Sequence, residues 1–123
     1  MAGKKVMVVD DEESLVELVS AILEREKYEV IKAADGQQCL DKLKSVKPDL
    51  ILLDMMMPGM SGREVCEKIR KNPKTKNLKV AFLTVAKFSE TGKDILVRMN
   101  VLDYITKPFD NDDLVRRVKK IVG

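Results

Sequence analysis

The chain has 123 residues, of which 45% are hydrophobic and 35% charged, and these proportions are typical of a folded domain rather than of a disordered chain. It contains no histidine, which excludes serine–histidine and cysteine–histidine triads and the usual zinc sites. The net charge of +3 is uneven, because residues 1–62 carry 8 basic and 12 acidic side chains whereas residues 63–123 carry 15 and 8.

The basic second half has two interpretations. It could mark a nucleic-acid footprint, or it could be a set of solvated faces on which lysine stems cover apolar surface. We favour solvated faces and expect no direct nucleic-acid contact, because the lysines are scattered and no aromatic side chains interleave with them. No apolar run approaches the roughly 20 residues of a membrane helix, and no signal-peptide core is present, so we expect a cytoplasmic protein without membrane contact.

Short apolar runs that predict strands alternate along the chain with amphipathic segments that predict helices. The predicted strands are Lys5–Val9, Glu29–Ala33, Leu50–Leu53, Val80–Thr84 and Asp103–Ile105. Each is followed by apolar residues three and four positions apart, the spacing of one helix face. These helix-face residues are Leu15, Leu18, Val19, Ile22 and Leu23; Cys39, Leu40 and Leu43; Val65, Cys66 and Ile69; Ile95, Leu96 and Met99; and Leu114, Val115, Val118 and Ile121.

Local signals place some helix ends. Asp35-Gly36 and Asp110-Asn111 supply turn or N-cap chemistry before the second and fifth helices. Lys47-Pro48 and Asn72-Pro73 are expected to end the second and third, because proline cannot continue a helix.

This alternation predicts a (βα)5 chain in the α/β class, a single domain over residues 1–123. Right-handed crossovers place helices on both faces of a parallel sheet. The second and fifth strands are the more polar, which suits edges and favours the flavodoxin-like strand order 2-1-3-4-5. Strands 1 and 3 are then neighbours, so Asp10, Asp11 and Asp54 are predicted to meet at their carboxyl ends.

Three carboxylates at one rim suit a hard divalent cation such as Mg²⁺, which also offsets their mutual repulsion. Asp11 and Asp54 could coordinate it directly, Asp10 through water, and a backbone carbonyl just past Asp54 could add a ligand. Acids at strand ends also serve as helix caps or solvated loop residues, so the acidic triplet by itself leaves both interpretations open.

Two further polar groups strengthen the metal interpretation. Thr84 ends the fourth strand and Lys107 follows the fifth, so both are expected at the same rim. Lys107 can pair with Asp54 and later with a phosphoryl oxygen, to which Thr84 can also donate a hydrogen bond. Asp54 is then a plausible nucleophile towards phosphorus, since carboxylates form aspartyl phosphates.

These motifs together resemble the response-regulator receiver domain of two-component signalling, over essentially the whole chain. The family has an acidic pair after the first strand, here Asp10-Asp11, and a phosphoacceptor after the third, here Asp54. It has serine or threonine after the fourth, here Thr84, and a Lys-Pro pair after the fifth, here Lys107-Pro108.

The resemblance implies that Asp54 accepts phosphate from a sensor histidine kinase or a histidine phosphotransfer protein. It implies Mg²⁺, with Mn²⁺ as the alternative, held by Asp10, Asp11, Asp54 and the Met56 carbonyl. It further implies a cis Lys107–Pro108 bond and a tight loop that depends on Gly62. The chain would be a signalling switch that takes part in its own phosphotransfer and dephosphorylation, rather than an enzyme.

By the same resemblance, Thr84 and Tyr104 form the switch. The segment that they would bias is Val85–Asn100, and the output face would be the fourth helix, fifth strand and fifth helix, read by a downstream protein or domain. Asp103 and Arg117 fall where related receivers place interface ion pairs, which raises a phosphorylation-dependent homodimer as a hypothesis.

Two positions depart from the commonest family pattern. Val85 stands where a smaller residue is frequent, so its branched side chain could narrow access to the phosphorylation site. Met99-Asn100-Val101-Leu102 replaces a turn that usually contains glycine, and Asn100 could still end the helix because asparagine tolerates the left-handed conformation.

Three other functions fit the sequence less well. A flavodoxin-like electron carrier needs a hydroxyl- and glycine-rich phosphate loop, whereas the loop here is Asp10-Asp11-Glu12-Glu13, which would repel a flavin phosphate. A haloacid-dehalogenase-type phosphatase has two acids spaced one residue apart after the first strand, unlike the adjacent pair here. A receiver that serves only as an interaction module is disfavoured, because all five site positions are filled.

Overall fold

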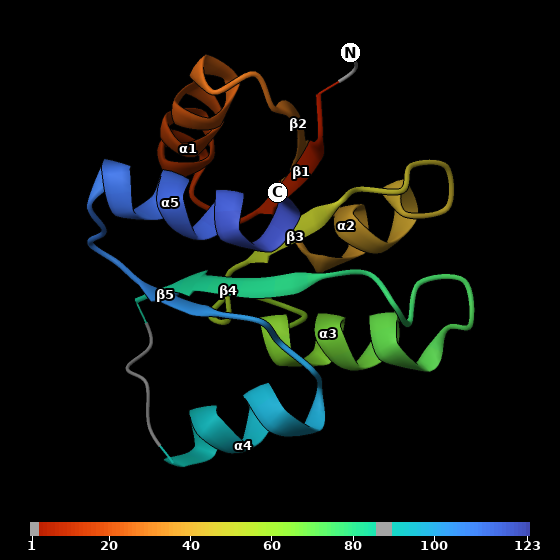
Figure 1. Cartoon of the computed structure of the whole chain (residues 1–123). Helices are drawn as coiled ribbons and strands as arrows, with labels where there is room; N and C mark the ends of the chain where they lie inside the picture. Colours follow the sequence, from red (N-terminus) through yellow and green to blue (C-terminus); the bar gives the residue numbers. More distant parts are fainter. Residues whose placement is uncertain (1–2, 86–89) are drawn as a thin grey trace.

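Five parallel strands form one sheet with helices packed on both of its faces (Figure 1). The computed structural model describes residues 3–85 and 90–123. The strands are β1 (Lys5–Val9), β2 (Glu29–Ala33), β3 (Leu50–Leu53), β4 (Val80–Thr84) and β5 (Tyr104–Thr106). The helices are α1 (Glu13–Arg25), α2 (Gly36–Lys42), α3 (Gly62–Lys71), α4 (Glu90–Arg98) and α5 (Asn111–Val122).

The strand order is β2-β1-β3-β4-β5, as the polarity of the second and fifth strands predicted. All residues of β3 and β4 are buried, which is how strands covered on both faces behave, whereas the edge strands β2 and β5 are only partly buried. The register pairs Val9 of β1 with Leu53 of β3, so these two strands end at the same level. The residue that follows each strand therefore lies at one rim of the sheet.

Two apolar cores lie on opposite faces of the sheet. One joins β1, β3 and β4 to α1 and α5 through side chains such as Val6, Leu23 and Leu114. The other joins the opposite side of the same strands to α2 and α3, with Met7 and Phe82 among its buried members. Because successive strand residues point to opposite faces, one apolar run supplies both cores, and this anchors the central strands rigidly.

Side-chain caps mark where three of the described helices, α2, α3 and α5, begin. Asp35 accepts a hydrogen bond from the Gln38 amide at 2.8 Å, and Asp110 caps α5 in the same manner, so both predicted N-caps are confirmed. A third cap was not predicted: Ser61 and Glu64 form a reciprocal capping box at the start of α3. The Ser-x-x-Glu spacing in the sequence is the pattern that could have predicted this cap.

Some predicted boundaries and faces were wrong in detail. Leu18 is 48% exposed, because the buried stripe of α1 runs through Val16, Val19, Ser20 and Leu23 and leaves position 18 to one side. The fifth strand begins and ends one residue later than predicted. Helix α2 ends well before Lys47-Pro48, so this proline does not terminate it. Of the predicted movable segment Val85–Asn100, residues 86–89 lie outside the described residues.

Within the part of the chain that the structure describes, no helix combines the length and the apolar character needed to cross a bilayer. Both cysteines, Cys39 and Cys66, are buried free thiols. Burial raises the pKa of Cys39 to about 12, which makes this thiol unreactive at neutral pH.

Candidate functional site

The acidic residues after β1 and β3 lie side by side because their strands pair. The Asp54 amide donates to the Val9 carbonyl at 3.0 Å, and the Asp10 amide donates to the Ala33 carbonyl of β2 at 3.2 Å. Each aspartate is thus held by the neighbouring strand at the point where its own strand ends. The strand order predicted from the sequence therefore accounts for this convergence of acids.

Carboxylate oxygens of Asp10, Asp11 and Asp54 all lie within 4.8 Å of one another. Asp10 is 3% exposed and Asp54 is 4% exposed, whereas Asp11 faces solvent. Charges this close repel where water is excluded, so a cation near the cluster would be favourable. Three hard oxygen donors, one of them open to solvent, fit Mg²⁺, which favours carboxylates while retaining several of its own waters.

Lys107 supplies positive charge from within the protein. Its ammonium lies 2.6 Å from Asp10 Oδ2 and 3.7 Å from Asp54 Oδ2. The sequence predicted a pairing with Asp54, yet the closer contact is with Asp10, and one ammonium bridges both carboxylates. The Lys107 amide donates to the Thr84 carbonyl at 2.9 Å, which fixes the lysine backbone against β4. The Lys107–Pro108 peptide bond is cis, as the sequence analysis expected.

The carboxylate of Asp54 is held by two donors on its own side of the pocket. The Thr84 side chain donates a hydrogen bond to it, and the Met56 amide donates to Oδ1 at 3.2 Å. Burial raises the pKa of Asp54 above its usual range, and the Asp10 charge adds to this, while the two hydrogen bonds and Lys107 oppose it. The two hydrogen bonds and Lys107 favour the ionised form of Asp54, whereas burial and the neighbouring Asp10 charge disfavour it.

The loop between Asp54 and α3 passes unusually close to the site backbone. A Cβ atom at Gly62 would lie 2.2 Å from the Asp54 carbonyl oxygen and 2.7 Å from Met55 Cα. The Gly62 amide donates to the Met55 carbonyl at 2.9 Å, which closes the loop. Only glycine fits such an approach, and this supports the tight loop expected before the third helix.

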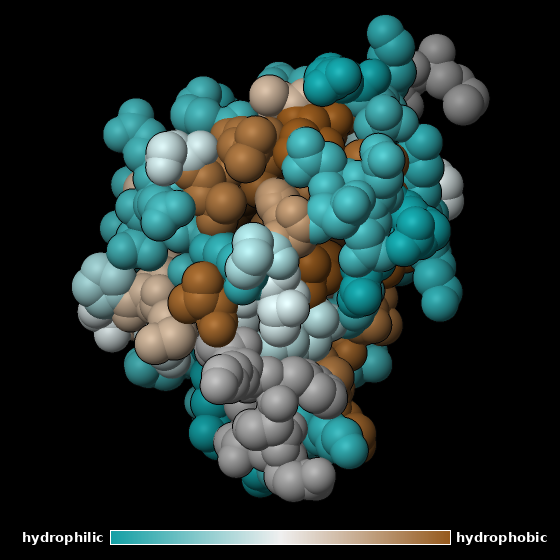
Figure 2. Space-filling view, turned by 90° about the vertical axis from the view of Figure 1, so that its left-hand side faces the viewer, coloured by the Kyte–Doolittle hydropathy of each residue, from teal (hydrophilic) through white to brown (hydrophobic). Residues whose placement is uncertain are grey.

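The site opens into a cavity of about 630 Å³ at the carboxyl end of the sheet. The three acids and Lys107 line it together with Val85, which is 59% exposed and borders the opening. Figure 2 shows the side of the molecule to which the β4 arrow points in Figure 1. On the surface of that side, hydrophobic residues lie between hydrophilic ones. Asp54 thus lines an open cavity whose lining includes the exposed Val85 side chain.

Known proteins that resemble this chain over most of its length are receiver domains. Residues 6–119 match the response regulator receiver domain. The chain belongs to the response-regulator receiver domain family. It is similar to the alkaline phosphatase synthesis transcriptional regulatory protein PhoP of Bacillus subtilis, with 43% identity over 120 residues. That match covers 98% of this chain and 49% of PhoP, so the chain spans about half the length of this relative.

Solved receiver structures share the fold throughout. The chemotaxis protein CheY4 of Vibrio cholerae is 31% identical, has a TM-score of 0.90, and the match covers 98% of this chain and 99% of CheY4. The response regulator TrrA of Thermotoga maritima, solved in complex with Mg(2+)-BeF, is 38% identical with a TM-score of 0.81. That match covers 96% of this chain and 98% of TrrA.

Receiver domains are signalling switches that histidine kinases phosphorylate and that act on output domains. Tyr104, the second residue of the predicted switch, is half-buried at the start of β5. Its hydroxyl donates to Met55 Sδ at 3.6 Å, and its ring packs edge-on against Phe82 with centroids 6.0 Å apart. Burial raises the pKa of Tyr104, and the charge of Asp54 contributes to the same direction. Tyr104 thus packs against the residue next to Asp54.

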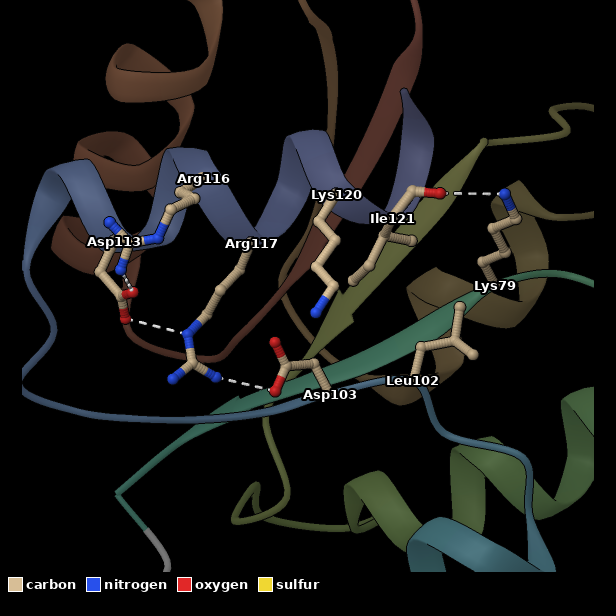
Figure 3. Close-up of a pocket in the computed structure, with 8 residues that line it drawn as sticks. All are labelled: Lys79, Leu102, Asp103, Asp113, Arg116, Arg117, Lys120 and Ile121. Carbon is tan, nitrogen blue, oxygen red and sulfur yellow. Dashed lines mark hydrogen bonds and ion pairs between the residues drawn. The ribbon is translucent and has the colours of Figure 1, made fainter.

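The expected interface pair, Arg117 of α5 and Asp103 just before β5, is an ion pair within this receiver domain. Arg117 donates to Asp103 Oδ1 at 2.8 Å and to Asp113 Oδ2 at 2.9 Å (Figure 3). Lys79 donates to the Ile121 carbonyl at 3.0 Å, at the far end of the same hollow. The hollow also contains the side chains of Leu102, Arg116 and Lys120, and basic groups outnumber acidic ones in it.

Proposed function

We propose that Asp54 of this receiver domain accepts a phosphoryl group from a histidine kinase or a histidine phosphotransfer protein, in the presence of Mg²⁺. The observation that carries the proposal is the surroundings of Asp54: a buried carboxylate, hydrogen-bonded by Thr84, within 3.7 Å of the Lys107 ammonium and beside two further acids. Buried, charged and accessible from one side, this oxygen is the nucleophile that the geometry supports best.

Asp11, Asp54 and the Met56 carbonyl would hold the Mg²⁺ ion directly, and Asp10 would contribute through water. The ion would offset both the acidic cluster and the charge of the phosphoryl oxygens, and Mn²⁺ has the same oxygen preference. Lys107 already neutralises one charge of the cluster, which leaves excess negative charge for a divalent cation. The crystal structure of TrrA with Mg(2+)-BeF supports this assignment by similarity.

The chain's own groups would guide the transfer. An ionised Asp54 oxygen attacks phosphorus as the phosphorus–nitrogen bond of the donor breaks, and the bonding electrons leave with the imidazole nitrogen. The Lys107 ammonium and the Thr84 hydroxyl are placed to meet phosphoryl oxygens, which carry the developing charge. No histidine or cysteine nucleophile takes part, and the protein acts as a switch rather than as an enzyme.

Phosphorylation adds about 1.5 to 2 negative charges and three acceptor oxygens beside Thr84. We propose that the Thr84 hydroxyl turns towards the phosphoryl group and that Tyr104 responds, which alters the face formed by α4, β5 and α5. The contact of Tyr104 with Met55 supports this route, since it links β5 to the loop that carries Asp54. A downstream protein or domain in the cytoplasm would read the altered face, without direct contact between this domain and nucleic acid.

Replacing Asp54 with asparagine is expected to abolish labelling, on the order of 100-fold or more, because the amide oxygen cannot act as the nucleophile. Intact-protein mass spectrometry after incubation with phosphoramidate and Mg²⁺ measures the added phosphoryl group. Asp41→Asn, an exposed α2 position, is the matched control and should label like the wild type. Equal labelling of the Asp54 variant, or full labelling after chelation of Mg²⁺, would contradict the proposal.

A phosphorylation-dependent homodimer through α4, β5 and α5 is a second element of the proposal. Leu102 is 47% exposed beside the Asp103–Arg117 pair, so apolar and charged groups that suit a self-complementary contact adjoin on this face. Sedimentation velocity with beryllofluoride and Mg²⁺ should show a larger species than the unmodified protein. The Arg117→Ala variant should remain monomeric in both conditions. An unchanged mass for the wild type would exclude the dimer.

A further inference from the structure

Arg70, near the carboxyl end of α3, donates hydrogen bonds to four backbone carbonyls and ties three chain segments together. Its Nε lies 2.7 Å from the Met99 carbonyl and its Nη2 lies 3.2 Å from the Asn100 carbonyl, both just after α4. Its Nη1 donates to the carbonyls of Leu78 at 2.7 Å and Lys76 at 3.0 Å, in the connection between α3 and β4. The guanidinium therefore joins α3 to the end of α4.

The carboxyl end of α4 has the geometry of a helix C-cap, at which the last carbonyls need hydrogen-bond donors such as the Arg70 guanidinium. Asn100 has a φ of 52°, and the Val101 amide donates to the Leu96 carbonyl at 3.0 Å, which is the six-to-one bond of a Schellman motif. The left-handed Asn100 confirms the helix stop expected from the sequence. Arg70 donates hydrogen bonds to the Met99 and Asn100 carbonyls at this helix end.

A guanidinium suits this position for two physical reasons. Carbonyls at a helix carboxyl end carry partial negative charge, so a cation there is favourable. The planar fork of arginine presents several donors at fixed directions, whereas the single ammonium of lysine cannot reach four acceptors in two segments at once. Charge-assisted hydrogen bonds are also stronger than neutral ones, so the four together make a firm attachment.

The helix that carries Arg70 begins at the phosphorylation site. Gly62, the first residue of α3, packs directly against the Asp54 carbonyl. The position of α3 therefore depends on the position of the Asp54 backbone. Helix α4 follows β4, whose last residue, Thr84, donates to the Asp54 carboxylate. Thus the two ends of α4 are connected to Asp54 by separate routes, one through Thr84 and the other through α3 and Arg70.

We propose that Arg70 is a positioning residue of the switch: it holds the carboxyl end of α4 in place while the amino end responds to Asp54. This inference rests on the proposed function, because it names the end of α4 that stays in place when phosphorylation moves the helix. With one end attached, a displacement near Thr84 rotates the helix instead of carrying it away as a body. The output face then changes in one defined direction.

The test compares hydrogen–deuterium exchange of residues 90–101 with and without Mg²⁺ and beryllofluoride. In the wild type, beryllofluoride should change the exchange of this segment. Arg70→Met should speed its exchange about two-fold or more in both states and remove at least half of the beryllofluoride-dependent difference. Arg70→Lys should retain part of the difference. Arg63→Met, which removes a guanidinium from the exposed face of the same helix, should behave like the wild type.

Two controls separate positioning from stability and from the function itself. Val118→Ala lowers stability from the α5 core without touching the Arg70 contacts, and it should keep the wild-type difference. A full beryllofluoride-dependent difference in Arg70→Met, or its equal loss in Val118→Ala, would overturn the role of Arg70 alone. If wild-type protein is labelled at Asp54 but residues 90–101 do not respond, the switch through α4 fails and the inference fails with it.

Discussion

Gly62→Ala is expected to destabilise the protein by about 3 kcal/mol, through overpacking against backbone that cannot move aside. The added methyl group would lie 2.2 Å from the Asp54 carbonyl oxygen and 2.7 Å from Met55 Cα, both below any normal contact. Side chains can change rotamer, but these atoms belong to the loop that β3 and α3 hold at both ends. Urea unfolding followed by circular dichroism measures the change.

Gly59→Ala is the matched control in the same loop. Its φ of 78° makes an alanine strained there, but nothing lies within 4 Å of a Cβ atom at that position. Conformational strain alone costs about 1 kcal/mol. The difference in unfolding free energy between Gly62→Ala and Gly59→Ala therefore measures the cost of the steric clash at Gly62. The folded fraction of Gly62→Ala should also label more slowly, since the clash displaces the backbone of Asp54. If Gly62→Ala is as stable as the wild type and is labelled at the same rate, the loop can open to accommodate the methyl group and the expected clash is contradicted.

Lys107→Met is expected to lower the free energy of unfolding of the metal-free protein by about 3 kcal/mol. It leaves Asp10 and Asp54 buried beside one another without the ammonium that now bridges them. Addition of Mg²⁺ should recover part of this loss and should stabilise the variant more than the wild type. Thermal unfolding with chelator and with Mg²⁺ measures both effects.

Lys32→Met provides the comparison for Lys107. Lys32 pairs with Glu17 at 2.9 Å on the surface, where such pairs contribute about 1 kcal/mol or less. Its removal should therefore have little effect, with or without Mg²⁺. A Lys107 variant as stable as the Lys32 variant in the absence of metal would mean that the acidic cluster does not depend on this cation.

The topology was predictable because the apolar pattern is strong and local. Strands such as Leu50–Leu53 are apolar throughout, which only a position covered on both faces explains, and the polar strands could then occupy only the edges. The caps at Asp35 and Asp110 were equally readable, since each side chain acts on amides two or three residues ahead. Leu18 was misassigned because adjacent leucine and valine residues make two helix faces fit the same spacing.

The acidic cluster was predictable for a related reason. Once β1 and β3 are neighbours, the residues that follow them share a rim, and Asp10, Asp11 and Asp54 must approach one another. The partner that Lys107 prefers was beyond the sequence. Its approach to Asp10 rather than to Asp54 depends on distances of about an ångström between side chains that lie far apart along the chain.

The strand order, the rim at which the polar residues meet and the types of residue gathered there all follow from the amino-acid sequence, because hydrophobic patterning and strand ends are local properties. The close approach that requires glycine at position 62 and the contacts of Arg70 became visible once the chain was folded. In the sequence Arg70 is one of many basic residues in the second half. Its four acceptors lie six to thirty positions away and are backbone carbonyls, which every residue has, so no side-chain pattern could have indicated them.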